Sequence, residues 1–299
     1  MYQDCRLCPR QCHVNREKQM GVCHAGAQVL VARAALHMWE EPCISGESGS
    51  GAVFFSGCSL GCVFCQNREI SGGQAGKEIT QQRLVEIFFE LKEQGANNIN
   101  LVTPDHYLPS VCSAIRQAKE QGIGLAFVWN CSGYECVESL RMLDGLVDVY
   151  LPDFKYFESE TAAKYSKAAD YPQVTKEAVA EMFRQVGACR FDENGIIQRG
   201  VIVRHLLLPG KVSEAKKIVS YLYETYGDDI YLSLMNQYTP GADAAERFSA
   251  FPELARKVTQ REYGRLVDFA LEIGVTNAFV QEGQTASESF IPAFDLKGV

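Results

Sequence analysis

The sequence predicts an α/β protein, namely a partial parallel TIM barrel of the (β/α)6 type with a small cysteine-rich lobe at its N-terminus. Short apolar runs alternate with helical segments, and strands that alternate with helices favour a parallel sheet. Polar residues follow each run, as in barrels whose chemistry lies at the carboxyl ends of the strands. The 299 residues are enough for one large α/β domain.

The barrel strands are expected in six apolar runs, with a possible seventh further on. The six runs are Ala52–Ser56, Asn98–Val102, Gly124–Val128, Val147–Leu151, Gly200–Leu207 and Ile230–Met235, and the possible seventh is Ala278–Gln281. Residues 28–36 are also apolar, and they fit a strand or a helix because their periodicity does not decide between the two.

Three of the intervening helices have recognisable ends, over residues 80–95, 109–122 and 259–274. Thr80 is a good N-cap for the first, Pro109 is a good first residue for the second, and each segment ends at a glycine. The third begins with the capping box that Thr259 and Glu262 can form.

A separate lobe is expected at the N-terminus, because Cys5, Cys8, Cys12 and Cys23 follow one another in a C-x2-C-x3-C-x10-C arrangement. Four soft ligands with turn residues between them can hold zinc tetrahedrally or a second 4Fe-4S cluster. The paired C-x2-C motifs of zinc ribbons are absent, which favours the cluster. A connector rich in glycine and serine follows, so we expect the lobe and connector at 1–50, the barrel at 51–282 and a tail at 283–299.

The composition limits the class of protein. A net charge of -8 argues against a protein that binds nucleic acid or an anionic membrane over a broad surface. No apolar run is long enough to span a membrane, and the first residues lack the apolar core of a signal peptide, so we expect a cytoplasmic protein. Twelve cysteines in such a protein indicate metal ligands more readily than disulfides.

The most informative stretch lies directly after the first predicted strand, where Cys58, Cys62 and Cys65 have C-x3-C-x2-C spacing. Three thiolates on one short loop can bind three irons of a 4Fe-4S cluster and leave the fourth iron open. With Phe64 before the last cysteine, the loop resembles the signature of the radical S-adenosylmethionine (SAM) superfamily. The resemblance implies that the open iron binds SAM, and that reductive cleavage of SAM yields a 5′-deoxyadenosyl radical that abstracts hydrogen from a substrate.

The resemblance extends to one group of that superfamily, the pyruvate formate-lyase activating enzyme-related proteins. It is carried by the cysteine-rich start, Glu40-Glu41-Pro42, the Gly51–Asn67 loop, Asn98–Pro104, Tyr150–Tyr156, Asp170-Tyr171-Pro172, Arg204–Gly210 and Met235–Tyr238. It implies contacts with SAM from Phe64, Thr103, Asn130, Asp153, Lys155 and Arg204. Thr103 stands where the activases carry a glycine-rich turn, and Asn130 where they carry an acidic residue.

The substrate is left open by the sequence. Activation of a glycyl radical enzyme and modification of another protein or peptide are the leading possibilities, with reduced flavodoxin or ferredoxin as the electron donor that the resemblance implies. A radical SAM enzyme for a small molecule, or an iron-sulfur protein for electron transfer or sensing, is the alternative. His106 and His205 lie near strand ends and could transfer protons or be structural.

Overall fold

The computed structural model describes residues 1–281 and 292–299. A ten-stranded sheet forms its centre. The strands are β1 (Val29–His37), β2 (Ser50–Phe55), β3 (Lys77–Ile79), β4 (Asn98–Val102), β5 (Ala126–Cys131), β6 (Val149–Pro152), β7 (Arg190–Phe191), β8 (Ile197–Leu206), β9 (Tyr231–Met235) and β10 (Ala278–Val280). Their order is β10-β9-β8-β6-β5-β4-β2-β1-β3, and β7 pairs with β8 off this path.

The partial barrel that the sequence predicts is formed by β2, β4, β5, β6, β8, β9 and β10. Neighbours from β2 through β4, β5, β6, β8 and β9 to β10 all pair in parallel, which confirms the fold class and includes the possible seventh strand. Within the described residues, the sheet path ends at β10 on one side and at β3 on the other, so the barrel is open. β5 extends to Cys131, which places Asn130 in the strand and not in the loop after it.

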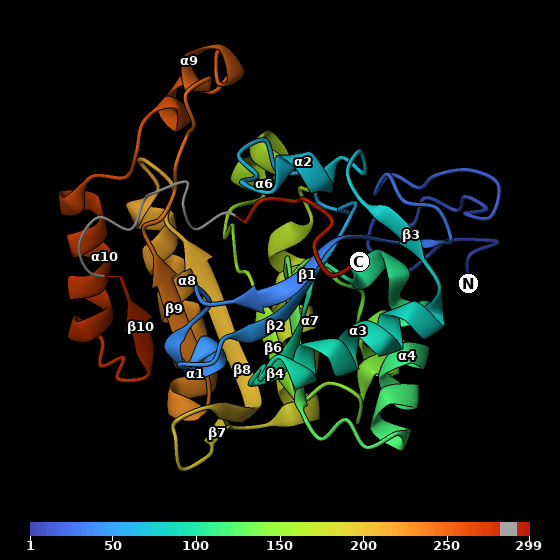
Figure 1. Cartoon of the computed structure of the whole chain (residues 1–299). Coiled ribbons are helices and arrows are strands. Elements are labelled where there is room, and N and C mark those ends of the chain that lie inside the picture. Colours follow the sequence, from blue (N-terminus) through green and yellow to red (C-terminus); the bar gives the residue numbers. More distant parts are fainter. Residues whose placement is uncertain (282–291) are drawn as a thin grey trace.

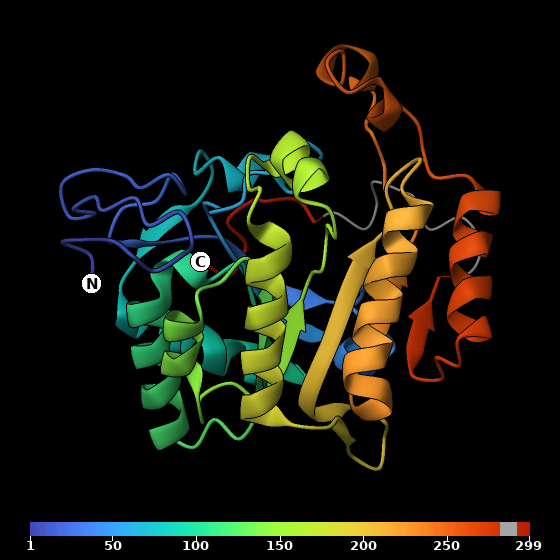
Figure 2. The same ribbon diagram turned by 180° about the vertical axis from the view of Figure 1, so that it is seen from behind.

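Helices cover the outer face of the sheet, as Figures 1 and 2 show for α3, α4, α7, α8 and α10. The helices are α1 (Pro42–Ser45), α2 (Arg68–Ser71), α3 (Gln81–Glu93), α4 (Leu108–Glu120), α5 (Val137–Leu140), α6 (Ser159–Ser166), α7 (Tyr171–Val186), α8 (Val212–Tyr226), α9 (Ala244–Arg247) and α10 (Gln260–Glu272). Short 3-10 turns cover Asp105–Tyr107, Arg141–Leu143, Gly227–Asp229 and Pro252–Ala255.

The predicted helix caps are present. The Thr80 side chain accepts a hydrogen bond from the backbone N–H of Arg83 at the start of α3. Thr259 and Glu262 make both hydrogen bonds of a capping box at the start of α10. Each cap pairs backbone N–H groups that have no partner inside the helix, so these helices begin where the sequence predicts.

β1 settles the ambiguity over residues 28–36, because it is a strand that pairs antiparallel with β2. The last residues of the sequence run along its other edge, where the Ala34 N–H donates to Lys297 O and the Leu296 N–H donates to Ala32 O. Figure 1 shows the C-terminus beside β1. Residues 283–291 of the predicted tail lie outside the described residues, and the division of the chain at residue 50 stays a prediction.

The N-terminal lobe, residues 1–27, folds as loops without helix or strand. Arg10 fixes it to the barrel side, because its guanidinium donates to the backbone oxygens of Ser59 and Leu60 and of Ser166 and Lys167. Arg16 is buried and donates to the backbone oxygens of Ala25 and His106. Nowhere in residues 1–281 or 292–299 is a helix long and apolar enough to cross a bilayer.

Candidate active site

The three-cysteine loop begins where β2 ends, at the carboxyl edge of the sheet. Gly57 there has φ of +98°, and a Cβ at this position would lie 2.7 Å from the carbonyl oxygen of Cys23. Only glycine fits this turn without a shift of the backbone. Beyond it, the backbone N–H of Cys58 donates to that same carbonyl oxygen at 3.0 Å. The loop therefore lies directly against the N-terminal lobe.

A cavity of about 220 Å³ opens beside this loop. Cys58, Cys62 and Cys65 all line it, and they are all partly exposed. The six residues expected to contact SAM line the same cavity: Phe64, Thr103, Asn130, Asp153, Lys155 and Arg204. The structure thus brings together nine residues from five separate stretches of the chain.

The charges at the polar end of the cavity form a closed network around Arg204. Its guanidinium donates to Asp153 Oδ1 at 3.1 Å, to Glu40 Oε2 at 3.2 Å and to Asn130 Oδ1 at 2.6 Å. Lys155 Nζ donates to the other oxygen of Asp153 at 2.5 Å. Two cations thus balance two anions, and these four side chains are between 10% and 18% exposed.

The network also decides the ionisation of Asp153. Burial raises the pKa of this carboxyl, but the neighbouring Arg204 and Lys155 outweigh burial and hold the pKa below its usual value. Asp153 is therefore a carboxylate near neutral pH, and it keeps the Lys155 ammonium in place. Asp153 forms a parallel bridge with Arg204 and does not cap a helix.

Glu40 also belongs to this network, although it is not among the residues predicted from the sequence to contact SAM. Its Oε1 accepts hydrogen bonds from Asn100 Nδ2 at 3.0 Å and from Asn130 Nδ2 at 3.2 Å. Burial raises its pKa, whereas Arg204 and the Asn100 amide oppose this effect. The Glu40-Glu41-Pro42 motif was the available signal, but it lies outside the strand ends to which the barrel rule points.

Thr103 has an unusual backbone for a β-branched residue, because its φ is +57°. Its N–H donates to the Asn130 carbonyl oxygen at 2.8 Å, which ties the turn after β4 to β5. The backbone here has the left-handed shape that glycine adopts without strain. The position that resembles a glycine-rich turn in the activases therefore keeps a glycine-like φ without the glycine.

Aromatic rings support the cysteine loop through Phe64. The Phe64 ring packs edge to face on Tyr156, Tyr165 and Tyr238, with centroids 6.2, 6.3 and 6.3 Å away. From the segment of α9, Arg247 donates to the carbonyl oxygens of Val63 at 2.8 Å and Cys65 at 3.1 Å. No sequence pattern marked Arg247 as a contact of this loop.

Two hydrogen bonds reach the cysteine sulfurs themselves. The Ser166 hydroxyl donates to Cys62 Sγ at 3.0 Å, and the Leu60 N–H donates to Cys58 Sγ at 3.4 Å. Such bonds stabilise charge on a sulfur ligand and shift the reduction potential of an iron-sulfur cluster. The loop thus suits a metal cluster better than a set of free thiols.

His106 and His205 are structural in this fold. His106 Nε2 donates to the Ser56 carbonyl oxygen, and His205 Nδ1 donates to the Phe154 carbonyl oxygen, each at 2.7 Å. Burial lowers the pKa of both side chains, to about 3 for His106, so both rings are neutral near pH 7. Neither histidine lines the cavity.

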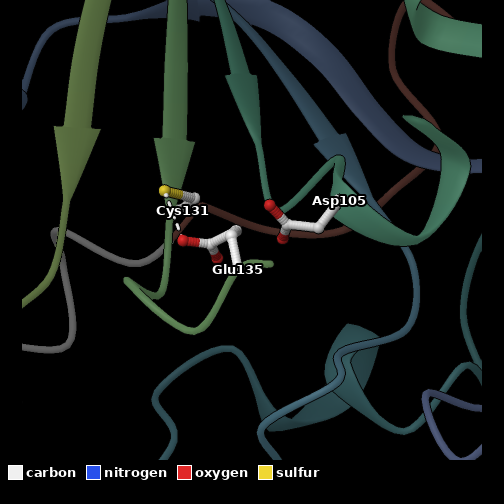
Figure 3. A group of neighbouring side chains, drawn as sticks. All are labelled: Asp105, Cys131 and Glu135. Carbon is white, nitrogen blue, oxygen red and sulfur yellow. Dashed lines mark hydrogen bonds between the residues drawn. The ribbon is translucent and has the colours of Figure 1, made fainter. Parts of the chain in front are cut away.

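A buried group next to the cavity contains two acids (Figure 3), and ligand atoms of Asp105, Cys131 and Glu135 are all within 4.8 Å of one another. Of the three, Cys131 lines the cavity. Cys131 Sγ and Ser132 Oγ donate to the two oxygens of Glu135, and Trp129 Nε1 donates to Asp105 Oδ1. Burial raises the pKa of Asp105 to about 6 and that of Glu135 well above its usual value. Among the described residues, Asp105 Oδ2 has no hydrogen-bond partner, and the raised pKa values favour the protonated forms of both carboxyls.

The open barrel and a cavity lined by three cysteines define an iron-sulfur enzyme of the βα-barrel type. Comparison with known families makes this more specific, because the model of the radical SAM superfamily matches residues 52–221. The chain belongs to this superfamily, whose members use a 4Fe-4S cluster and SAM.

Among individual proteins, an uncharacterized protein of Methanocaldococcus jannaschii is 28% identical over 277 residues, which cover 90% of this chain and 75% of that protein. Among solved structures, Streptococcus suis SuiB bound to the precursor peptide SuiA matches with a TM-score of 0.52 and 11% identity. The match covers 76% of this chain and 47% of SuiB, so the chain spans about half the length of that protein. At this identity the likeness shows the fold.

Proposed function

We propose that Cys58, Cys62 and Cys65 bind three irons of a 4Fe-4S cluster and that SAM lies in the adjoining cavity. The observation that carries the proposal is that these cysteines share one cavity with a closed network of charged and amide side chains. A set of sulfur donors without carboxylate or histidine suits an iron-sulfur cluster.

The bound cluster would supply the electron that cleaves SAM, and the resulting 5′-deoxyadenosyl radical would remove hydrogen from the substrate. The protein's own residues hold the geometry. Arg204 and Lys155 offer cationic donors to the methionine carboxylate of SAM, and Asp153 and Glu40 fix their positions. Thr103 is proposed to meet the methionine amino group and the Phe64 backbone the adenine edge. Asn130 is hydrogen-bonded to both Arg204 and Glu40 and so holds these two side chains in place.

The proposed substrate is a protein or peptide, with a glycine hydrogen of a glycyl radical enzyme as the leading candidate. Support comes from the resemblance to the activating enzyme-related group and from the precursor peptide in the SuiB structure, whose fold is similar.

The first test measures cleavage of SAM. Protein reconstituted anaerobically with iron and sulfide and reduced with dithionite should release 5′-deoxyadenosine and methionine. Cys62→Ala should abolish the release. Cys189→Ala should keep it, because Cys189 bonds to the Val201 carbonyl oxygen and does not line the cavity. Equal release by wild type and Cys62→Ala would refute the assignment of the site.

The second test addresses the substrate class. Peptides that contain deuterated glycine should transfer deuterium to 5′-deoxyadenosine if a glycine hydrogen is abstracted. Deuterium transfer from another labelled residue would support a peptide substrate but would exclude glycine as the site of hydrogen abstraction. SAM cleavage that no peptide or protein accelerates and that transfers no deuterium would contradict a peptide substrate.

A further inference from the structure

The four cysteines of the N-terminal lobe form a second sulfur-rich site. Cys5, Cys8 and Cys23 are buried and Cys12 is partly exposed, in a lobe without secondary structure of its own. Turn-type backbone hydrogen bonds hold its loops, and a metal that crosslinks them would stabilise the lobe further. No disulfide joins these cysteines in the structure, since all four are free thiols.

The arrangement of the four cysteines favours one of the two metals that the sequence left open. Cys5, Cys8, Cys12 and Cys23 lack the paired C-x2-C motifs of zinc ribbons. A 4Fe-4S cluster would bind each of the four cysteines to a different iron.

Gly21 leaves room between two of the sulfurs. A Cβ at Gly21 would lie 3.3 Å from Cys23 Sγ and 3.5 Å from Cys12 Sγ, so a side chain there would enter the space beside both. Its φ is not in the left-handed region, so glycine is not required by the backbone. The missing side chain therefore keeps free the space at these sulfurs.

The lobe also touches the catalytic loop directly. The Cys23 carbonyl oxygen accepts the N–H of Cys58, so a proposed ligand of one site is hydrogen-bonded to a proposed ligand of the other. Arg10 strengthens the contact, because it donates to the backbone oxygens of Ser59 and Leu60 in the catalytic loop. The two cysteine sites are therefore in direct backbone contact at Cys23 and Cys58.

From these contacts we propose that the lobe holds a second 4Fe-4S cluster on Cys5, Cys8, Cys12 and Cys23, and that it relays electrons to the catalytic cluster. The relay rests on the proposed function, since it needs a cluster at Cys58, Cys62 and Cys65. A reduced flavodoxin or ferredoxin gives one electron to the lobe cluster, which passes it to the catalytic cluster, and no bond or proton is transferred. The partly exposed Cys12 gives the donor its approach.

Metal content tests the site. The wild-type chain should hold about eight irons after anaerobic reconstitution, and both the Cys8→Ala/Cys23→Ala variant and the Cys58→Ala/Cys62→Ala/Cys65→Ala variant about four. Gly21→Ala should lower iron content or speed its loss, whereas Gly26→Ala should not, because a Cβ at Gly26 meets only the Arg16 carbonyl oxygen at 3.5 Å. A wild-type chain with about four irons and one zinc would overturn the proposal.

Electron paramagnetic resonance and rapid mixing test the relay. The fully reduced wild type should show spectra broadened by interaction between two spins, and each cysteine variant should show a single unbroadened cluster. Reduced flavodoxin should reduce the catalytic cluster several-fold more slowly in Cys8→Ala/Cys23→Ala than in wild type. An unchanged rate in a variant that has lost about four irons would refute the relay.

A further measurement keeps this result distinct from a failure of the proposed function. Dithionite is small and can reduce the catalytic cluster directly, so Cys8→Ala/Cys23→Ala should still cleave SAM after prolonged incubation with it. If wild type shows two interacting clusters but does not cleave SAM, the proposed function fails while the second cluster stands. If dithionite restores cleavage in the variant while flavodoxin does not, the relay is supported.

Discussion

Glu40 and Arg204 are 164 residues apart in the sequence, yet their side chains form an ion pair of 3.2 Å at the polar end of the cavity. Glu40 lies just after the end of β1 and before the first parallel strand, whereas Arg204 lies in β8. The pair therefore joins the segment before the first parallel strand to the far half of the sheet, and it orients the guanidinium toward Asp153 and Asn130.

Removal of Glu40 should weaken both the fold and the binding of SAM. Glu40→Ala leaves a buried guanidinium with one anionic partner fewer, which should cost about 2–4 kcal/mol in the free energy of unfolding. Glu40→Gln keeps the amide contacts and should cost less. Urea unfolding and calorimetric titration with SAM measure the two effects. Glu47→Ala is the matched control because Glu47 is exposed, and an equal loss in that variant would contradict the prediction.

Lys155 should contribute to SAM affinity through its charge. Lys155→Met removes the ammonium held by Asp153 and should raise the Kd for SAM about tenfold, which corresponds to about 1.4 kcal/mol. Lys155→Arg should lose less. Lys217→Met serves as control because Lys217 is exposed and pairs with Glu158, and neither residue lines the cavity. If Lys155→Met bound SAM as tightly as wild type, the cation would have no part in binding.

Thr103→Gly should be tolerated or should stabilise the fold, by up to about 1 kcal/mol, because glycine adopts φ of +57° without the strain of a β-branched side chain. Gly57→Ala should act in the opposite direction, since its Cβ would lie 2.7 Å from the Cys23 carbonyl oxygen. Denaturant unfolding of both variants checks the pair. A clear destabilisation by Thr103→Gly would show that the threonine side chain makes a contact worth more than the strain.

Asp105 should make the protein less stable as the pH rises. Burial raises its pKa in the folded state to about 6, above the value of about 3.9 in the unfolded chain, so the folded state binds more protons between these values. The stability it contributes is complete below pH about 3.9 and is lost as the pH rises through about 6.

Asp105→Asn removes the carboxyl whose pKa is raised to about 6. From pH 5 to pH 8, the wild type should therefore lose about 1 kcal/mol more stability than this variant. Chemical unfolding at both pH values measures the difference. Asp268→Asn, at an exposed position, should keep the wild-type pH dependence. A pH dependence in Asp105→Asn that equals that of the wild type would argue against a raised pKa at Asp105.

Arg247→Ala should loosen the cysteine loop, because the loop then loses hydrogen bonds to the carbonyl oxygens of Val63 and Cys65. Each such bond contributes about 1 kcal/mol, so the cluster should be lost in air several-fold faster. Visible absorbance follows the loss, with Arg261→Ala, at an exposed position, as control. Identical rates of cluster loss in the two variants would mean that the Arg247 hydrogen bonds do not protect the cluster.

The sequence predicted the parts of this fold that depend on local pattern. The barrel strands and the caps at Thr80 and Thr259 could be predicted because apolar runs and capping residues are local signals. The rule that parallel barrels place polar groups at the carboxyl edge then gathered Asn130, Asp153 and Arg204 correctly into one cavity.

The remaining features depend on contacts between distant segments. Glu40 reaches the site from the connector after β1, and Arg247 reaches it from α9, which follows β9. No periodicity in the sequence predicts such positions. Only the packing of β5 against the turn after β4 places Cys131 and Asp105 together. Tertiary structure, not local pattern, creates this buried group.

The last residues of the sequence have a consequence for the order in which the protein is made. Pro292 lines the cavity, and the segment after it is bonded to β1. During synthesis, the cysteine loop leaves the ribosome more than 200 residues before this part of the wall exists. A chain still in translation therefore presents its cysteines in a pocket whose wall still lacks Pro292.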